Sequence, residues 1–421
     1  MFGPLISNPR THADLIIPSP TPNLSVLPMP RNRAAGAAAG VAGLPPDMLA
    51  NIRGRLSLLD RLAFAAAFRM PVAPCLVLPA DTPETATLFS LAHRRSAVVR
   101  APGPDHLVLG SSFSRGWLVT ADALARLRLV NPVTGEQRAL PAIETIPCVD
   151  AQRGGSVFSF EEKPFIRGPP PYPAGFAVMT PGAMRRYFYR KVVLSDSGAV
   201  AMLITDLRYG AVAFATAEGR VWRLVPSRHG IAKAGTKCAR WPRPPSRDSI
   251  EDAVHHGGRF YSITYSGEVE AWEQDADGTG VFTSVVVAPG QPWCDHRKYL
   301  VTAPGGRLMV VLKQSDRITH RLTFKVHVLD AGAEQWKEAG DIGDAALFVG
   351  VNGSLCVSTR EHPELRAGCV YYTADDLSPY YPDNQRGAGV FSLKDGREEK
   401  VEGLGPHRNK PPPAWFTLCI P

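Results

Sequence analysis

Apolar residues follow two different patterns along this chain. From residue 44 to residue 70 they recur at helical spacing, whereas from about residue 76 short runs of Val, Leu, Phe and Tyr alternate with turns rich in Gly, Asp and Pro. The first pattern predicts a short helical segment, and the second predicts many short strands. The fold class that follows is mainly β, preceded by a short helical segment.

Two helices are predicted in the helical segment. Pro45 or Pro46 suits the first turn of the first helix, because no amide donor is needed there, and Asp47 lies near the positive end of the helix dipole. The second helix is expected to have Asp60 as its N-cap and to end before Pro71. An apolar stripe on the first helix consists of Met48, Leu49, Ile52 and Leu56.

The β region carries a rough repeat. Trp222 and Trp272, which end similar strand–turn–strand patterns, lie 50 residues apart. Propeller blades take about 40–50 residues each. Residues 76–421 therefore predict a β-propeller of about six or seven blades. The Pro- and Gly-rich stretch 143–173 is either an irregular blade or a long loop.

The first 43 residues differ from the rest in composition. They are rich in Pro, Ala and Gly and almost free of aromatic residues, which predicts a disordered tail. The tail carries three arginines and one acidic residue, a balance also found in organelle transit peptides. We expect an intracellular protein of the cytoplasm, the nucleus or both, with organellar targeting as the alternative.

The net charge of +8 raises the question of anionic partners. The densest basic cluster, Arg185–Lys191, has interleaved aromatic residues, as a single-strand nucleic-acid site would. A strand with an exposed basic face has the same sequence pattern, and we favour it, so no nucleic-acid partner is expected. No run approaches the roughly 20 apolar residues of a membrane helix, so no membrane partner is expected either.

Candidate chemistry is sparse. The seven cysteines include no C-x-x-C pair and are expected to be reduced thiols. Cys356, His362 and Cys369 fit no zinc-ligand spacing, and the stretch 230–237 lacks the Gly-Lys-Ser/Thr order of a phosphate loop. We therefore predict no catalytic residue, metal or cofactor. The predicted function is therefore that of a non-enzymatic platform for protein interactions. A further alternative is an enzyme or small-ligand site in the central channel of the propeller.

The stretch "LPPDMLANIRGRLSLLDRLAFAAAF" resembles an F-box. Downstream, "GSSFSRGWLVTAD", "ALFVGVNGSLCVS" and "GVFSLKDG" resemble the KIB-type propeller of plants, also called domain of unknown function 295. The F-box positions that match are Leu44, Pro45, Asp47, Leu49, Ile52, Leu56 and Asp60.

This resemblance implies a substrate receptor of an SCF ubiquitin ligase, without a cofactor. The seven matching residues would bind a Skp-type adaptor, and the propeller would present an unknown target protein. The family's F-box usually continues into another helical turn, whereas here Pro71 follows at once. The apolar stripe then either faces the adaptor or packs on the propeller itself. The alternative function is a propeller interaction protein without a ligase link.

Overall fold

The computed structural model describes residues 44–67, 72–79, 85–100, 108–160, 178–205, 212–217, 219–225, 249–275, 280–293, 296–303, 305–316, 319, 321–330, 332–374, 387–404 and 412–417. The predicted tail and the stretch 230–237 lie outside these residues. Residues 1–50 and residues 51–421 form two compact units. Helix α2 (Pro46–Arg55) begins in the first unit, and helix α3 (Leu58–Ala67) belongs to the second.

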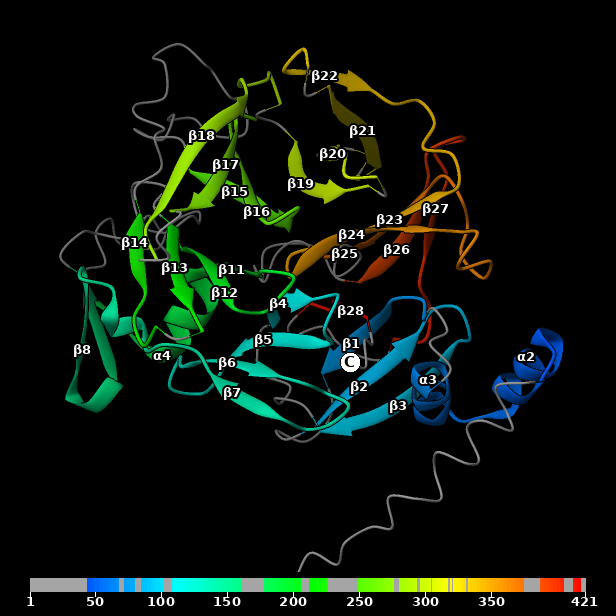
Figure 1. Ribbon diagram of the computed structural model, residues 1–421, viewed down its shortest axis with the longest axis horizontal. Helices are drawn as coiled ribbons and strands as arrows, with labels where there is room; N and C mark the ends of the chain where they lie inside the picture. Colours follow the sequence, from blue (N-terminus) through cyan, green and yellow to red (C-terminus); the bar gives the residue numbers. More distant parts are fainter. Residues whose placement is uncertain are drawn as a thin grey trace, which may run out of the picture. The chain divides into compact units, whose positions relative to one another are not determined.

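The described strands form seven sheets, six of which are the blades of a ring (Figure 1). The strands of the ring are β28 (Ala414–Phe416), β1 (Cys75–Pro79), β2 (Thr85–Ser90) and β3 (Arg95–Arg100) in blade 1; β4 (Val108–Ser112), β5 (Trp117–Ala121), β6 (Leu127–Val130) and β7 (Gln137–Ala139) in blade 2; β11 (Tyr189–Leu194), β12 (Val200–Thr205), β13 (Val212–Thr216) and β14 (Arg223–Val225) in blade 3; β15 (Ile250–His256), β16 (Arg259–Thr264), β17 (Val269–Gln274) and β18 (Phe282–Ala288) in blade 4; β19 (Arg297–Thr302), β20 (Leu308–Ser315), β21 (Leu322–Asp330) and β22 (Gln335–Glu338) in blade 5; β24 (Gly353–Ser358), β23 (Ala345–Gly350), β25 (Cys369–Thr373), β26 (Ala388–Ser392) and β27 (Glu398–Lys400) in blade 6.

The order of the blades follows from the strands that line the centre of the ring. Strand β28 lies beside β4, β4 beside β11, β11 beside β15, β15 beside β19, and β19 beside β24. Strands β23 and β24 in turn lie beside β28, which closes the circle. At the contact between blades 2 and 3 only glycine fits at position 110, because a Cβ there would overlap the carbonyl oxygen of Val192. The predicted propeller is thus confirmed, with six blades in its ring.

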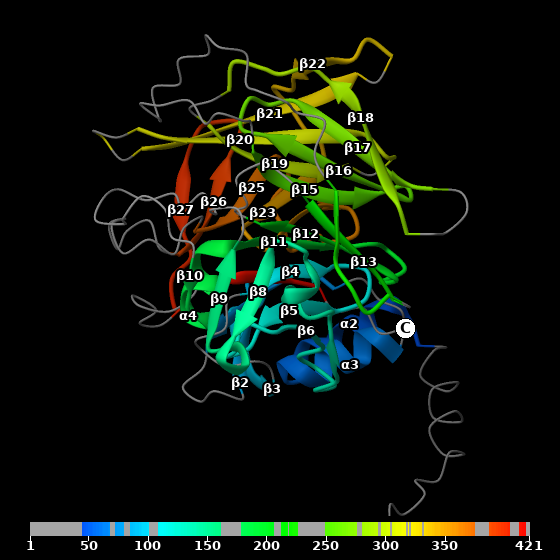
Figure 2. The same ribbon diagram turned by 90° about the vertical axis from the view of Figure 1, so that its left-hand side faces the viewer.

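The seventh sheet lies outside the ring and includes the described part, 143–160, of the stretch 143–173 (Figure 2). This side sheet consists of β8 (Val149–Gln152), β9 (Val157–Phe160) and β10 (Val178–Met179). Short helical turns flank it: η1 (Ile143–Thr145), η2 (Arg153–Gly155), α4 (Pro181–Ala183) and η3 (Met184–Phe188). Its apolar residues share one core cluster with residues of blades 2 and 3, including Phe158, Phe160, Leu109 and Val192. The described part of the stretch, residues 143–160, therefore belongs to an irregular insertion packed against the ring.

The ring closes through a strand from each end of the propeller. Strand β28 pairs antiparallel with β1, with Trp415 opposite Leu76. The buried Trp415 indole donates to the Val349 carbonyl over 2.9 Å, and the Asn352 side chain accepts from the Trp415 amide and donates to its carbonyl. The Ser111 hydroxyl donates to the same carbonyl over 2.8 Å. One residue therefore joins blades 1, 2 and 6.

The two helices begin where local capping chemistry favours them. Helix α2 starts at Pro46 with Asp47 in its first turn, as expected. The predicted N-cap at Asp60 is wrong, because α3 starts at Leu58. The Asp60 amide donates to the Ser57 hydroxyl, which in turn donates to the Asp60 carboxylate over 2.6 Å. Ser57 is the residue that caps α3, and Asp60 in the first turn accepts a hydrogen bond from its hydroxyl.

We predict that Trp415→Ala lowers the free energy of unfolding by about 3–5 kcal/mol, the usual cost of emptying a buried tryptophan site. The matched control Val98→Ala removes an apolar side chain that is 63% exposed on β3, and it should change stability by less than about 0.5 kcal/mol. Urea unfolding measures both. A loss of less than about 1 kcal/mol in Trp415→Ala would show that closure does not depend on this residue.

Candidate partner-binding surfaces

Helix α3 is built into the propeller. Leu58 and Leu62 on one side of the helix are buried, 4% and 3% exposed. They share a core cluster with Val77, Leu88 and Phe416 of blade 1. This apolar face of α3 is therefore covered by the outer side of blade 1 and is not free to contact a partner.

Two arginines fix the turn between α2 and α3. The buried Arg61 donates through Nε to the Leu56 carbonyl over 3.0 Å and also contacts the Gly54 carbonyl. Arg95 on β3 donates to the same Leu56 carbonyl over 2.9 Å. Cations at a helix C-terminus satisfy its free carbonyls and interact favourably with its dipole. The last turn of α2 is thereby tied both to α3 and to blade 1.

Burial acts on the two titratable side chains at this junction. Burial, and then the neighbouring Arg95 and Arg53, lower the pKa of Arg61. Burial, and then Arg61 and Arg53, also lower the pKa of His93 below its ordinary value. His93 is therefore neutral at pH 7 and adds no further positive charge to the cluster.

The sequence-predicted F-box positions lie in and around α2 and at the start of α3. In the first unit, Pro45 and Asp47 are exposed, and Leu44 and Leu49 are half-buried; in the second, Ile52 and Asp60 are exposed and Leu56 is half-buried. Ile52 stays 36% exposed and Leu59, which sequence reasoning missed, 38%. Ile52 and Leu59 are thus the large apolar side chains that the described residues 51–60 leave exposed to solvent.

A groove of about 300 Å³ lies between blades 1 and 6. Its apolar lining includes Phe89, Leu91 and Tyr371. Its charged lining includes Arg366 and Glu399, which form a 3.0 Å ion pair. The hydrogen bond from Arg366 lowers the pKa of Glu399 and holds it ionised. The groove offers a surface for binding, and its charged pair is already neutralised.

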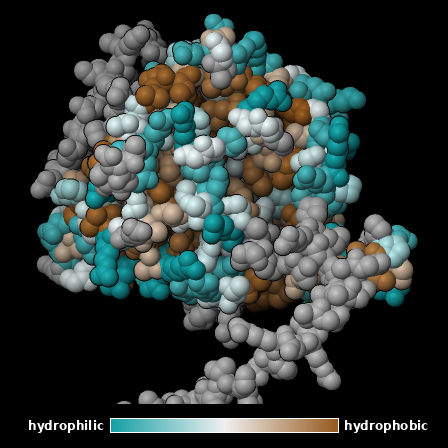
Figure 3. Space-filling model, in the orientation of Figure 1, coloured by the Kyte–Doolittle hydropathy of each residue, from teal (hydrophilic) through white to brown (hydrophobic). Residues whose placement is uncertain are grey.

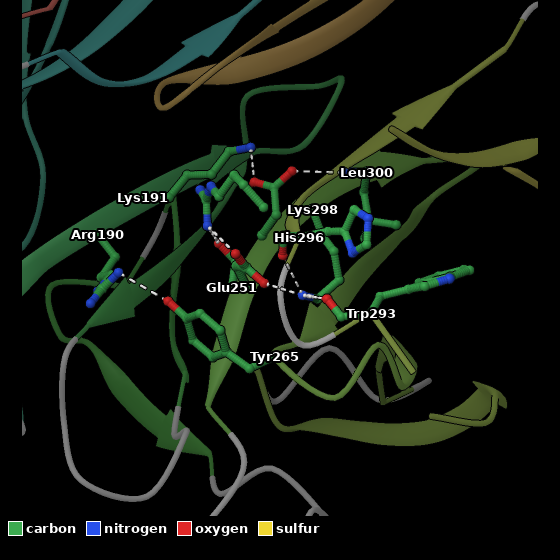
Figure 4. A network of polar contacts seen from close by, with 10 residues as sticks. Arg190, Lys191, Glu251, Tyr265, Trp293, His296, Lys298 and Leu300 are labelled. Carbon is green, nitrogen blue, oxygen red and sulfur yellow. Dashed lines mark hydrogen bonds and ion pairs between the residues drawn. The ribbon is translucent and has the colours of Figure 1, made fainter. Parts of the chain in front are cut away.

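Five charged residues meet on the inner strands of blades 3, 4 and 5 (Figure 4). Lys298 pairs with Glu251 over 2.7 Å, Arg297 with Glu251 over 3.1 Å, and Lys191 with Asp252 over 2.5 Å. The other carboxylate oxygen of Asp252 accepts from the Leu300 amide, and the Lys298 ammonium also donates to the carbonyls of Trp293 and His296.

The burial of this cluster is relevant to the alternative function, an enzyme or small-ligand site in a central channel. The side chains of Glu251, Asp252 and Lys298 are each no more than 1% exposed, and each forms an ion pair within the protein. Buried ion pairs hold elements together, whereas a reactive carboxylate needs access to a substrate. The ion pairs of this cluster thus connect the inner strands of blades 3, 4 and 5.

The basic cluster Arg185–Lys191 does not form a stacking surface. It folds as the turn η3 followed by the start of β11. Phe188 and Tyr189 are buried, and the Tyr189 hydroxyl donates to the Ala125 carbonyl over 2.7 Å. Lys191 is buried against Asp252, so the favoured interpretation of a strand with an exposed basic face holds only for part of the cluster.

The remaining candidates can be followed only in the described part of the chain. There, no group of three or more His, Cys, Asp or Glu residues could hold a metal ion, Cys356, His362 and Cys369 included. Burial raises the pKa of the Cys356 thiol to about 11 and that of Cys75 to about 12, so both are thiols at neutral pH. Among the described helices, none is long and apolar enough to cross a membrane.

A ring of radially arranged sheets, closed by a strand from each end, defines a β-propeller. The KIB1-4 beta-propeller family model matches residues 88–392, and the chain belongs to that family. The match includes strands of all six blades of the ring but not the helical segment.

Curated relatives carry the F-box in their names. The F-box protein At2g17036 of Arabidopsis thaliana is 22% identical over 51% of this chain and 53% of its own length. The F-box/kelch-repeat protein At1g64840 of the same plant is 29% identical over 36% of this chain and 38% of its own. The chain thus spans about half or less of the relatives it matches. Among solved structures, TolB from Acinetobacter baumannii aligns over 85% of this chain and 73% of its own, with a TM-score of 0.42 and 11% identity.

We predict that Asp252→Asn lowers the free energy of unfolding by about 3–5 kcal/mol, because Lys191 then stays buried without a counter-charge. Glu136→Gln is the matched control, since its ion pair with Arg138 is exposed and contributes at most about 1 kcal/mol. Both are measured by urea unfolding. If both variants lost the same small amount of unfolding free energy, the ion pair between Lys191 and Asp252 would not stabilise the contact between blades 3 and 4.

Proposed function

We propose that this protein is a substrate receptor of the F-box type. The helical segment binds a Skp-type adaptor, and the propeller presents a target protein to an SCF ubiquitin ligase. Ubiquitin transfer takes place on other subunits, so the chain itself is not an enzyme and needs no cofactor. Membership of the KIB1-4 propeller family and the F-box names of the relatives support this proposal.

One observation carries the proposal: a helical segment that is anchored to the ring and still exposes large apolar side chains. Leu58 and Leu62 hold α3 on blade 1, while Ile52 and Leu59 remain in solvent. A receptor must keep its adaptor and its target at a fixed separation, since transfer depends on positioning. An anchored helix provides that fixed geometry without a flexible linker.

The adaptor contact would be smaller than in a full F-box. Residues 68–74 lie between α3 and β1, and the sequence there carries Pro71 and Pro74, which do not suit the interior of a regular helix. The contact therefore rests on the matching positions already predicted, with Leu59 added. These are Leu44, Pro45, Asp47, Leu49, Ile52, Leu56 and Asp60.

A second candidate is a propeller interaction protein without a ligase link, in the cytoplasm, the nucleus or an organelle. The burial of Leu58 and Leu62 on blade 1 favours it, because this part of the helical segment has become a piece of the propeller. In that case Ile52 and Leu59 are the exposed remainder of an F-box whose partner has been lost.

Co-purification with a recombinant Skp-type adaptor separates the two candidates. The full-length chain should retain the adaptor, and Ile52→Asp and Leu59→Asp should each weaken retention at least tenfold, because a carboxylate in an apolar contact must be desolvated. Val98→Asp, at a site 63% exposed on β3, is the control and should bind like the wild type.

A variant with a complete F-box helix inserted after α3 serves as the positive control. If that variant retains the adaptor and the wild type does not, the ligase role is wrong for this protein. Equal retention by all the aspartate variants would show that the adaptor binds elsewhere.

A further inference from the structure

Among the strands that the structure describes, the outer strands of the blades are protected against pairing, with one exception. An outer strand leaves half of its backbone donors and acceptors free, and proteins protect such edges by making them short or charged. Among the described outer strands, β7, β14 and β27 have three residues each, β22 has four and includes Lys337 and Glu338, and β3 begins and ends in arginine.

Strand β18 at the edge of blade 4 is neither short nor charged. Its seven residues, FTSVVVA, include no charge and four β-branched side chains. Val285 is 47% exposed and Val286 48%, and Val281 just before the strand is 48% exposed. Figure 3 shows an apolar area where β18 lies. Within the described residues the sheet ends at β18, with no strand on its outer side.

We propose that the free edge of β18 binds an extended, uncharged segment of a partner protein as an added strand. The outward amides and carbonyls of β18 would pair with the backbone of that segment, as in other cases of β-strand addition. Side chains of the segment would pack beside Val285 on one face of the sheet and beside Val286 on the other, which favours β-branched residues at these positions.

The edge is held rigidly enough to bind without first becoming ordered. The Phe282 ring stacks on Phe214 of blade 3 with centroids 3.8 Å apart. Further along, Ser284 lies opposite the buried Trp272 and donates to the Glu270 carboxylate over 3.3 Å. A preformed edge loses little conformational freedom on binding, which favours affinity.

The size of the edge favours a peptide segment over a second copy of the chain. Val287 is an extra residue in the ladder between Val286 and Ala288, so the regular edge runs only from Phe282 to Val286. Five residues extend about 17 Å, and neighbouring strands lie about 5 Å apart, which gives a footprint on the order of 100 Å². Stable interfaces bury about 800 Å² per partner.

The inference rests on the proposed function in one respect, namely that the bound segment belongs to a target protein. Its test uses no adaptor. A failed adaptor experiment therefore leaves the edge proposal standing, and a failed edge experiment leaves the adaptor proposal standing.

The probe is a phage-displayed library of random 12-residue peptides, selected on the full-length chain. Enriched peptides are synthesised, and their affinities are measured by fluorescence polarisation. We expect alternating β-branched residues in the enriched peptides and protection of the β18 amides from hydrogen exchange when a peptide is bound. Val285→Lys should weaken binding at least tenfold, whereas the matched control Val98→Lys on β3 should leave it unchanged.

Thr283→Lys, which also places a charge on an exposed position of β18, replaces Val285→Lys if thermal unfolding shows the latter to be destabilised. The proposal would be overturned if the selection yielded no peptide whose binding depends on β18. It would also be overturned if the enriched peptides bound the wild type and both β18 variants with equal affinity. A concentration-dependent dimer in sedimentation velocity that Val285→Lys abolishes would also overturn it, in favour of a second copy at this edge.

Discussion

The pairing of β28 with β1 is the constraint on which the other contacts of the ring depend. It joins segments about 340 residues apart in the sequence, and the entropy of closing so long a loop must be recovered by local contacts. Trp415 supplies them, because its indole and its backbone are bonded to blades 2 and 6 as well as paired with β1. Each remaining blade is then held between two neighbours.

The helical segment depends on the same closure. Leu58 and Leu62 of α3 share their core cluster with Ala414 and Phe416 of β28, and Arg95 of β3 holds the end of α2. Release of β28 would therefore expose the surface on which α3 packs. Helix α3 and the ring are therefore parts of one packed structure.

The sequence predicts well which segments form helices and strands, and it predicts poorly which distant residues these elements contact. Periodicity identifies the helical segment, the propeller and the start of α2, because these follow from neighbouring residues. The sequence does not distinguish Ser57 as the cap, because Asp60 is also a good one, and it gives no clear strand pattern for the side sheet, because the strands there are only two to four residues long. The contact of Arg95 with Leu56 and the pairing of Lys191 with Asp252 join residues 39 and 61 positions apart, which no local pattern reveals.

The central claim, that α3 is an integral part of the propeller, is tested most directly by native-state hydrogen exchange of the full-length chain. If α3 opens only when blade 1 opens, the slowest amides of α3, β1 and β28 should report the same free energy of opening and the same dependence on denaturant. The claim would be contradicted if the α3 amides exchanged at a much lower free energy while those of β1 and β28 remained protected.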